Sequence, residues 1–199
     1  MWVVKIGGSM NNDPMLPQWL DLLVQLGGGR VTIVCGGGGF ADEVRRSQAH
    51  WQFDDLRAHN MAVLAMAQTA FLAQGINPRL RIARSKAAIR QVLHSGHTAL
   101  WLPTAWVRDR ASGNTCWAMS SDSLALDLAR KLNAERLVVV KSCPIAPRAD
   151  LAELCASGVL DSRFEALAED AGFPIDVVSR TDLAQVRSLL LGEIRLVGV

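Results

Sequence analysis

The chain has 199 residues, of which 50% are hydrophobic and 20% are charged. That balance is typical of an ordered globular protein and argues against an intrinsically disordered chain. The formal net charge of +2 at pH 7 is too close to neutral to indicate nucleic-acid or membrane-surface binding. We therefore expect neither a nucleic-acid partner nor a membrane partner.

The sequence predicts neither a targeting signal nor a structural metal. Its start, MWVVKIGGSM, lacks the basic region, apolar stretch and cleavage site of a signal peptide. The longest apolar run, residues 61–73, is interrupted by Gln68 and is too short to span a bilayer. The four cysteines include no C-x-x-C pair, so we expect reduced thiols and no zinc. Together these features predict a cytoplasmic protein.

Apolar segments of strand length alternate with helical segments along the first half of the chain. In chain order, the predicted elements are a strand at 2–6, a helix at 13–27, a strand at 31–35, a helix opening in the glycines that follow, a helix at 53–74, a strand at 80–83, a helix at 85–94 and a strand at 98–102. Asp13 is the expected N-cap of the first helix, with Pro14 at its first position. Gly75 is the expected C-cap of the helix at 53–74.

The second half continues this alternation after an irregular segment at 103–119. Its predicted elements are a helix at 122–132, a strand at 136–140, helices at 149–156 and 163–171, a strand at 175–178, a helix at 182–191 and a strand at 194–199. Strands that are apolar on both faces and alternate with helices indicate an α/β fold with a mostly parallel sheet covered on both sides. We expect a single domain over residues 1–199, with ligands bound beyond the carboxyl ends of the strands.

Four consecutive glycines follow the predicted strand at 31–35. They are Gly36, Gly37, Gly38 and Gly39, and a helical segment comes directly after them. Glycine amides and a helix N-terminus can together surround an anion, which favours a phosphate-handling site. The alternative is a tight turn that needs glycine and binds nothing.

Two known nucleotide-binding patterns give different answers for this loop. A Walker-type loop needs Lys-Ser or Lys-Thr after its last glycine, and this chain has Phe-Ala there, so that pattern is excluded. The dinucleotide pattern G-x-G-x-x-A fits Gly36, Gly38 and Ala41. Its acidic partner would be Asp54 or Asp55, which fall at a predicted helix start rather than at a strand end. A nicotinamide-dependent enzyme stays an alternative.

Two lysines stand at the ends of apolar strands. Lys5 precedes a second glycine turn, formed by Gly7, Gly8 and Ser9, and Lys141 follows the strand at 136–140. A buried ammonium is costly without an anionic partner. The functional interpretation is that these charges neutralise a transferring phosphoryl group whose oxygens the glycine amides hold. The alternative is that each lysine extends its ammonium to solvent at the rim of the sheet.

Asp122 lies in a run of serines at the head of the helix predicted at 122–132. Aspartate and serine are both favoured N-cap residues, so this carboxylate has an ordinary structural explanation. In a site that holds two lysines, it could also orient both of them through charge-assisted hydrogen bonds. The sequence leaves these two roles open.

Three segments of the chain, VVKIGGS, VTIVCGGGG and SDSLALDLARKLNAERLVVVK, resemble successive blocks of the amino acid kinase family. That family includes acetylglutamate, aspartate, uridylate, carbamate and isopentenyl phosphate kinases. The resemblance implies a three-layer αβα sandwich, phosphoryl transfer from ATP with Mg²⁺ to a small molecule, and a homo-oligomer. It also implies an acceptor and phosphoryl site in the N-terminal half and a nucleotide site in the C-terminal half.

The same resemblance implies roles for individual residues. Lys5 matches the lysine that contacts the transferring phosphoryl group, and Asp122 matches the aspartate that organises the lysines. The family commonly has Thr-Asp where this chain has Lys141 and Ser142. It also commonly has a second catalytic lysine in a later G-M-x-x-K-like segment, and the nearest cation in that part of this chain is Arg163. Either Lys141 or Arg163 supplies that second charge. The glycines that match those binding phosphoryl oxygens are Gly7, Gly8, Gly37 and Gly38.

Scattered residues resemble one subgroup of the family, the kinases of methanofuran-type cofactor synthesis. They are His59, Met61, Met66, Trp117, Ser121 to Ser123, Lys141 and Ser142. That subgroup converts 5-(aminomethyl)-3-furanmethanol phosphate to its diphosphate. His59, Trp117 and Ser121 become candidate substrate contacts on this basis. A helix histidine that is only hydrogen-bonded and a tryptophan that only packs are the ordinary alternatives.

The sequence thus predicts a kinase of a small phosphomonoester and leaves three rivals. The acceptor could be a carboxylate, which would give an acylphosphate. The chain could be a catalytically degenerate kinase fold that binds nucleotide or oxyanion, since the Thr-Asp pair is missing and the second lysine is unassigned. The third rival is the dinucleotide-dependent oxidoreductase. The basic side chains between residues 79 and 90 are expected to form a solvated face, with binding of an anionic substrate as the alternative.

Overall fold

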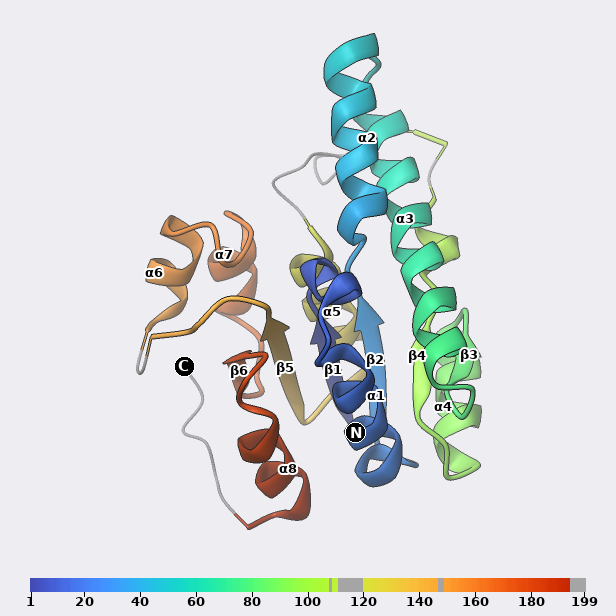
Figure 1. Cartoon of the computed structure of the whole chain (residues 1–199), viewed down its shortest axis with the longest axis vertical. Helices are drawn as coiled ribbons and strands as arrows, with labels where there is room; N and C mark the ends of the chain where they lie inside the picture. The colour runs from blue at the N-terminus through green and yellow to red at the C-terminus, as the bar shows by residue number, and fades with distance from the viewer. Residues whose placement is uncertain (108, 111–119, 147–148, 194–199) are drawn as a thin grey trace.

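The computed structural model describes residues 1–107, 109–110, 120–146 and 149–193. Within them, one six-stranded sheet has the order β3-β4-β2-β1-β5-β6, and every neighbouring pair of strands is parallel (Figure 1). The strands are β1 (Trp2–Ile6), β2 (Val31–Cys35), β3 (Arg81–Ala83), β4 (Ala99–Trp101), β5 (Arg136–Lys141) and β6 (Ile175–Ser179). The predicted α/β class with a parallel sheet is confirmed.

Helices connect each strand to the next parallel strand. They are α1 (Leu16–Gly27), α2 (Gly38–Trp51), α3 (Asp55–Ile76), α4 (Lys86–His94), α5 (Ser121–Leu132), α6 (Leu151–Ala156), α7 (Phe164–Ala168) and α8 (Leu183–Leu191), with short 3-10 helices η1 (Gly8–Asn12) and η2 (Pro103–Trp106). Parallel strands need such crossovers because each chain segment must return to the same edge of the sheet.

The strand register sorts side chains between two hydrophobic cores. Val3 and Val139 point to one face and pack with residues of α4, α5, α6 and α7. Val4 and Val138 point to the other face and pack with residues of α1, α3 and α8. Successive strand residues alternate between faces, so a strand that is apolar throughout contributes to both cores. The result is the three-layer αβα sandwich that the sequence predicts.

The antiparallel pair of α2 and α3 extends beyond the carboxyl ends of the strands (Figure 1). The side chain of Asp54 caps α3 by accepting a hydrogen bond from the backbone N–H of Arg57. Asp54 thus lies at a helix start, as the sequence predicts, and not at the strand end that a dinucleotide-binding site requires. The helix pair forms one wall above the edge of the sheet where ligands are expected.

Several predicted boundaries are wrong for local reasons. The first helix begins at Leu16 rather than after Asp13, because Asp13 ends η1 and its carboxylate accepts a hydrogen bond from the N–H of Met15. Gly75 lies inside α3, which continues to Ile76, so it is not the C-cap. The predicted strand at 194–199 and most of the irregular segment at 103–119 lie outside the described residues, apart from η2 at that segment's start.

Among the described residues, no helix is both long and apolar enough to cross a membrane. The three cysteines in this part of the chain are free thiols, and Cys35, at the end of β2, is buried. Burial raises the pKa of the Cys35 thiol to about 12. This thiol therefore behaves as a small apolar group beneath the glycine loop.

Candidate functional site

The two glycine turns meet above the carboxyl ends of β1 and β2. A Cβ atom added to Gly8 would lie 2.2 Å from the backbone nitrogen of Gly38, and one added to Gly36 would lie 2.5 Å from the nitrogen of Gly8. Gly38 has a φ of +53°, in the left-handed region that favours glycine. Only glycine allows these backbones to approach so closely, and the contact brings the start of α2 beside the start of η1.

Lys5 and Lys141 project from neighbouring strands toward the same face of the sheet. Lys5 pairs in register with Val139 on β5, and Lys141 lies two residues further along that strand. Because side chains alternate along a strand, both lysines point toward the face that α5 covers. The register thus explains why two charges far apart in the sequence reach one position.

Asp122 lies between the two ammonium groups. The Nζ atom of Lys5 is 2.6 Å from Asp122 Oδ1, and the Nζ atom of Lys141 is 2.6 Å from Asp122 Oδ2. The side chains of Lys5 and Asp122 are 3% and 4% exposed, so this ion pair is buried. One carboxylate thereby orients two cations, and the three groups together carry a net charge of +1.

Burial and charge act in opposite directions on these groups. Burial alone would raise the pKa of Asp122, but the charges of Lys5 and Lys141 and their hydrogen bonds hold it below its usual value of 3.8. Burial, and then the charge of Lys5, lower the pKa of Lys141, while the carboxylates of Asp122 and Asp161 oppose that shift. The site therefore keeps Asp122 ionised across the neutral pH range.

The helix start that carries Asp122 is capped by another residue. Ser120 is the N-cap of α5, and its hydroxyl accepts a hydrogen bond from the N–H of Asp122. The carboxylate of Asp122 instead faces the two lysines. The N-cap explanation considered for Asp122 is therefore wrong, because the neighbouring serine fills that position.

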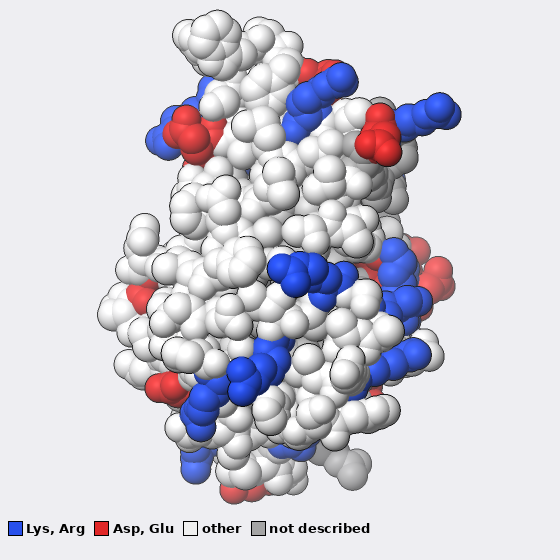
Figure 2. Space-filling view, turned by 90° about the vertical axis from the view of Figure 1, so that its right-hand side faces the viewer, with Lys and Arg blue, Asp and Glu red and all other residues white. Residues whose placement is uncertain are grey.

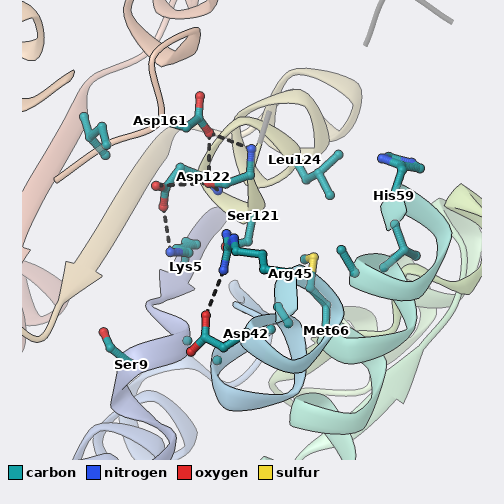
Figure 3. A pocket seen from close by; sticks show the side chains of 18 of the residues that line it. Lys5, Ser9, Asp42, Arg45, His59, Met66, Ser121, Asp122, Leu124 and Asp161 are labelled. Atoms are coloured by element: carbon teal, nitrogen blue, oxygen red, sulfur yellow. Dashed lines mark hydrogen bonds and ion pairs between the residues drawn. The ribbon is translucent and has the colours of Figure 1, made fainter. Parts of the chain in front are cut away.

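A cavity of about 410 Å³ opens above this charged group (Figure 3). Lys5 and the two glycine turns form its floor, and α2 and α3 form one wall through residues such as Arg45 and His59. The start of α5 and the segment 158–161 form the opposite wall. The volume is in the range of small-molecule sites in proteins.

Most of the residues selected from the sequence lie around this cavity. Those that line it are Lys5, Gly8, Ser9, Gly37, Gly38, His59, Ser121, Asp122 and Lys141. Ser142 is not in the lining, but its hydroxyl lies 2.7 Å from the Ser9 hydroxyl. Gly7, Gly36 and Gly39 support the turns without lining the cavity. Trp117 lies outside the described residues.

The sequence offers Arg163 and Lys141 as alternatives for the second cation. Arg163 precedes α7 and is not among the described residues that line the cavity. Lys141 contacts Asp122 directly. The geometry thus places Lys141, and not Arg163, in the charged group.

Two features of the cavity were not found by sequence reasoning. Asp161 accepts hydrogen bonds from Ser120 and Ser123 at the start of α5. Arg45, on α2, forms an ion pair with Asp42 in the cavity wall. Arg45 lies about two turns into α2, the helix that the glycine loop opens, and this placement is a signal that the sequence offered. No local pattern marks Asp161, because its partners lie about forty residues earlier.

The described residues offer no cluster of three or more histidine, cysteine or acidic side chains suited to a metal ion. Both oxygens of Asp122 face lysine ammonium groups. Mg²⁺ commonly keeps several waters and binds through substrate phosphates with one or two carboxylates. The residues described here therefore fit a Mg²⁺ ion carried by a nucleotide better than a resident ion in a protein cage.

The fold and the charged group together define an α/β protein with a positively charged cavity at the carboxyl edge of a parallel sheet. The family model described as "Amino acid kinase family" matches residues 1–144. The chain belongs to the amino acid kinase family. The resemblance seen in the sequence is confirmed at this level.

Individual relatives are distant. The chain is 24% identical over 141 residues to the (5-(aminomethyl)furan-3-yl)methyl phosphate kinase of Methanocaldococcus jannaschii, a match that spans 70% of this chain and 64% of that relative. The uridylate kinase of Archaeoglobus fulgidus has a similar structure, with a TM-score of 0.70 at 15% identity over 96% of this chain and 95% of that one.

Two further solved structures share the fold. The UMP kinase of Bacillus anthracis gives a TM-score of 0.70 at 16% identity, over 96% of this chain and 91% of that one. The aspartate kinase of Synechocystis gives 0.67 at 16% identity, over 90% of this chain and 38% of that one. At such identities the similarity establishes the architecture and leaves the substrate to the site's chemistry.

Proposed function

We propose that this chain is an ATP-dependent phosphotransferase that acts on a small phosphomonoester and forms a diphosphate. The observation that carries the proposal is the buried Lys5–Asp122–Lys141 group beneath a cavity floored by two glycine turns. Its net positive charge faces the place where a phosphoryl group would sit. The membership of the amino acid kinase family supports the same reaction class.

Phosphoryl transfer requires alignment and charge neutralisation more than covalent chemistry from the protein. In this proposal, the ammonium groups of Lys5 and Lys141 neutralise the oxygens of the phosphoryl group in flight. Backbone N–H groups of the turns at Gly8 and Gly38 hold the same oxygens, aided by the positive end of α2. Asp122 keeps both lysines aimed and remains ionised throughout.

The cavity residues favour an acceptor that already carries a phosphate. Arg45 and His59 line the wall opposite α5 and add hydrogen-bonding capacity beyond the two lysines, with the charge of Arg45 shared with Asp42. A phosphomonoester also supplies its own nucleophilic oxygen and requires no general base. The relative from Methanocaldococcus jannaschii makes the phosphate of 5-(aminomethyl)-3-furanmethanol the first acceptor to test. His59, Ser121 and Trp117 stay candidate substrate contacts.

We place the acceptor against the N-terminal half of the sheet and ATP over its C-terminal half, with the chain working as one domain. Mg²⁺ would enter with the nucleotide and neutralise its phosphate oxygens. The two lysines and the glycine turns would bind the transferring phosphoryl group, and Asp122 would orient the lysines. Ser9 and Ser142, which bridge the two halves, lie where both ligands would meet.

An ATP-consumption assay over small phosphomonoesters and carboxylates tests this proposal, with phosphorus NMR of the product. A diphosphate signal supports it, whereas a hydroxylamine-labile acylphosphate would identify the carboxylate alternative. Lys5→Ala is expected to lower kcat by at least about a hundredfold, or ~2.7 kcal/mol.

Binding of Mg-ATP without consumption by any acceptor would indicate a degenerate kinase fold. Thermal stabilisation by NAD(P) but not by Mg-ATP would indicate an oxidoreductase.

We also propose that the chain forms a homo-oligomer through the exposed side of α3. Five large apolar side chains are exposed there, and we call them the α3 apolar face: Met61, Leu64, Phe71, Leu72 and Ile76. The helix has no charged residue from Ala58 onward. Figure 2 views this side of the molecule and shows a broad area without charged groups between lysine and arginine side chains. An uncharged helical stripe suits a second copy of itself.

A further inference from the structure

Asp161 makes an unusual connection between two distant segments of the chain. It ends the segment 158–161, which lines the cavity, and it reaches back to the first turn of α5 (Figure 3). Its Oδ2 atom accepts hydrogen bonds from the N–H of Ser120 at 3.0 Å, the Ser120 hydroxyl at 3.0 Å and the N–H of Ser123 at 3.1 Å. Its Oδ1 atom accepts one from the Ser123 hydroxyl at 2.7 Å.

Three of these four hydrogen bonds end on Oδ2 and one ends on Oδ1, so both oxygens of the carboxylate are engaged by the start of α5. Two of the donors are backbone N–H groups at the start of α5, where a helix leaves such groups without partners. Asp161 therefore acts as a second cap supplied from outside the helix.

Asp122 lies between the two serines that Asp161 holds. Ser120 is also the residue whose hydroxyl accepts from the N–H of Asp122. The buried Ser123 has its hydroxyl bound to Asp161 on the other side of Asp122. The turn that presents the Asp122 carboxylate to Lys5 and Lys141 is thus fixed at both ends by one side chain.

We propose that Asp161 is a positioning residue of the phosphoryl-transfer site, which holds Asp122 between the two lysines. The inference rests on the proposed function for its catalytic consequence. The segment that the family resemblance singled out for a second cation supplies a carboxylate here, while the cation comes from the end of β5.

The charged groups around Lys141 give this positioning role an electrostatic consequence. They are Lys5 from β1, Asp122 from α5 and Asp161 from the segment before α7. Burial and the charge of Lys5 favour the neutral amine, and the two carboxylates favour the ammonium. Removing the charge of Asp161 should therefore make Lys141 lose its proton at a lower pH.

The test compares three variants of the full chain. Asp161→Asn keeps the side-chain shape and removes the charge, Ser123→Ala keeps the charge and removes one hydrogen bond, and Asp150→Asn is the matched control. Asp150 caps α6 by accepting from the N–H of Glu153 and does not line the cavity, so its variant removes the same charge from a similar cap elsewhere.

With Asp161→Asn, we expect kcat to fall by roughly ten- to hundredfold through misplacement of the reacting groups, with the KM for ATP within about threefold. The alkaline limb of the kcat profile should move to lower pH. Ser123→Ala should lower kcat without moving that limb, and Asp150→Asn should change only the Tm. Unchanged kcat and alkaline limb in Asp161→Asn would overturn the proposal. A large rise in the Mg²⁺ requirement would do so as well, by identifying a metal ligand.

A measurement without turnover separates this proposal from the proposed function. The chain has four lysines, so carbon NMR can follow each ε-carbon through an alkaline titration. Asp161→Asn should move the Lys141 titration to lower pH, even if the wild type proves to consume no ATP. Equal titrations in both proteins would refute the electrostatic role. If Asp161→Asn does not fold, an unchanged kcat in Ser123→Ala would refute the positioning role.

Discussion

Replacing Asp122 by asparagine tests the energetics of the buried charged group most directly. The substitution keeps the side-chain volume and removes the carboxylate that contacts both Lys5 and Lys141. Breaking a buried ion pair by removing one partner typically costs about 3–5 kcal/mol, because the other charge is left without compensation. Two ammonium groups are left here, so we expect the free energy of unfolding at pH 7 to fall by about that amount.

Urea unfolding followed by circular dichroism measures this loss, and the chain offers a matched control. Lys131 and Asp127 form an ion pair with the same 2.6 Å separation on the surface of α5, where their side chains are 48% and 36% exposed. Asp127→Asn should cost no more than about 0.5 kcal/mol, since exposed helix pairs contribute little. If Asp122→Asn cost no more than this control, the assignment of Asp122 as the essential counter-ion would be wrong.

The pH dependence gives a second check, with a definite sign at each end. The pKa of Asp122 is lowered in the folded state, so its contribution is complete above the usual value of 3.8 and is lost as the pH falls toward the folded-state pKa. The wild type should therefore lose more stability on acidification below about pH 4 than Asp122→Asn does. At alkaline pH the variant should recover stability, because an uncompensated Lys141 can become neutral.

Three further predictions concern other parts of the molecule. Gly8→Ala should separate the two glycine turns, because the new Cβ would lie 2.2 Å from the backbone nitrogen of Gly38. We expect a lower kcat and a free energy of unfolding reduced by about 1–3 kcal/mol. In the same unfolding assay the control Gly39→Ala, whose Cβ would meet nothing within 4 Å, should not lower stability. Phe71→Glu should shift the molar mass in light scattering toward the monomer, and an unchanged mass would exclude the α3 apolar face as the contact. Cys35 should resist labelling by a thiol reagent in the native state at pH 8, because burial raises its pKa to about 12, and rapid labelling would contradict its burial.

The sheet and the charged group could be predicted largely from sequence because the signals are local or periodic. Apolar strands alternating with helices fix a parallel sheet, and parallel strands bring their carboxyl ends to one edge. Lys5, Lys141 and both glycine turns end such strands, so their convergence follows from the class of fold. The start of α5 was harder to predict, because Ser120 and Asp122 are equally good N-cap residues. Only the residue at which the helix begins distinguishes them.

The residues that escaped prediction depend on tertiary contacts between distant segments. Asp161 contacts α5 across about forty residues, and nothing in its own neighbourhood distinguishes it from a solvated aspartate. Asp13 looked like a helix cap because its carboxylate does accept a backbone hydrogen bond, but within a turn before α1. Local propensity correctly indicated that the Asp13 carboxylate accepts a backbone hydrogen bond, but wrongly placed that bond at the first turn of α1.

The position of Lys141 also explains how a site of this kind tolerates a carboxylate in the segment 158–161. Neighbouring parallel strands lie about 4.8 Å apart, so two lysines on the same face and two residues apart in register can share one carboxylate. Once β5 provides the second ammonium, the later segment has no need to supply a cation. An additional cation there would raise the repulsion among buried charges, whereas a carboxylate lowers it and also caps α5. In this chain the second ammonium beside Asp122 therefore comes from the end of β5, and the segment 158–161 contributes a carboxylate instead.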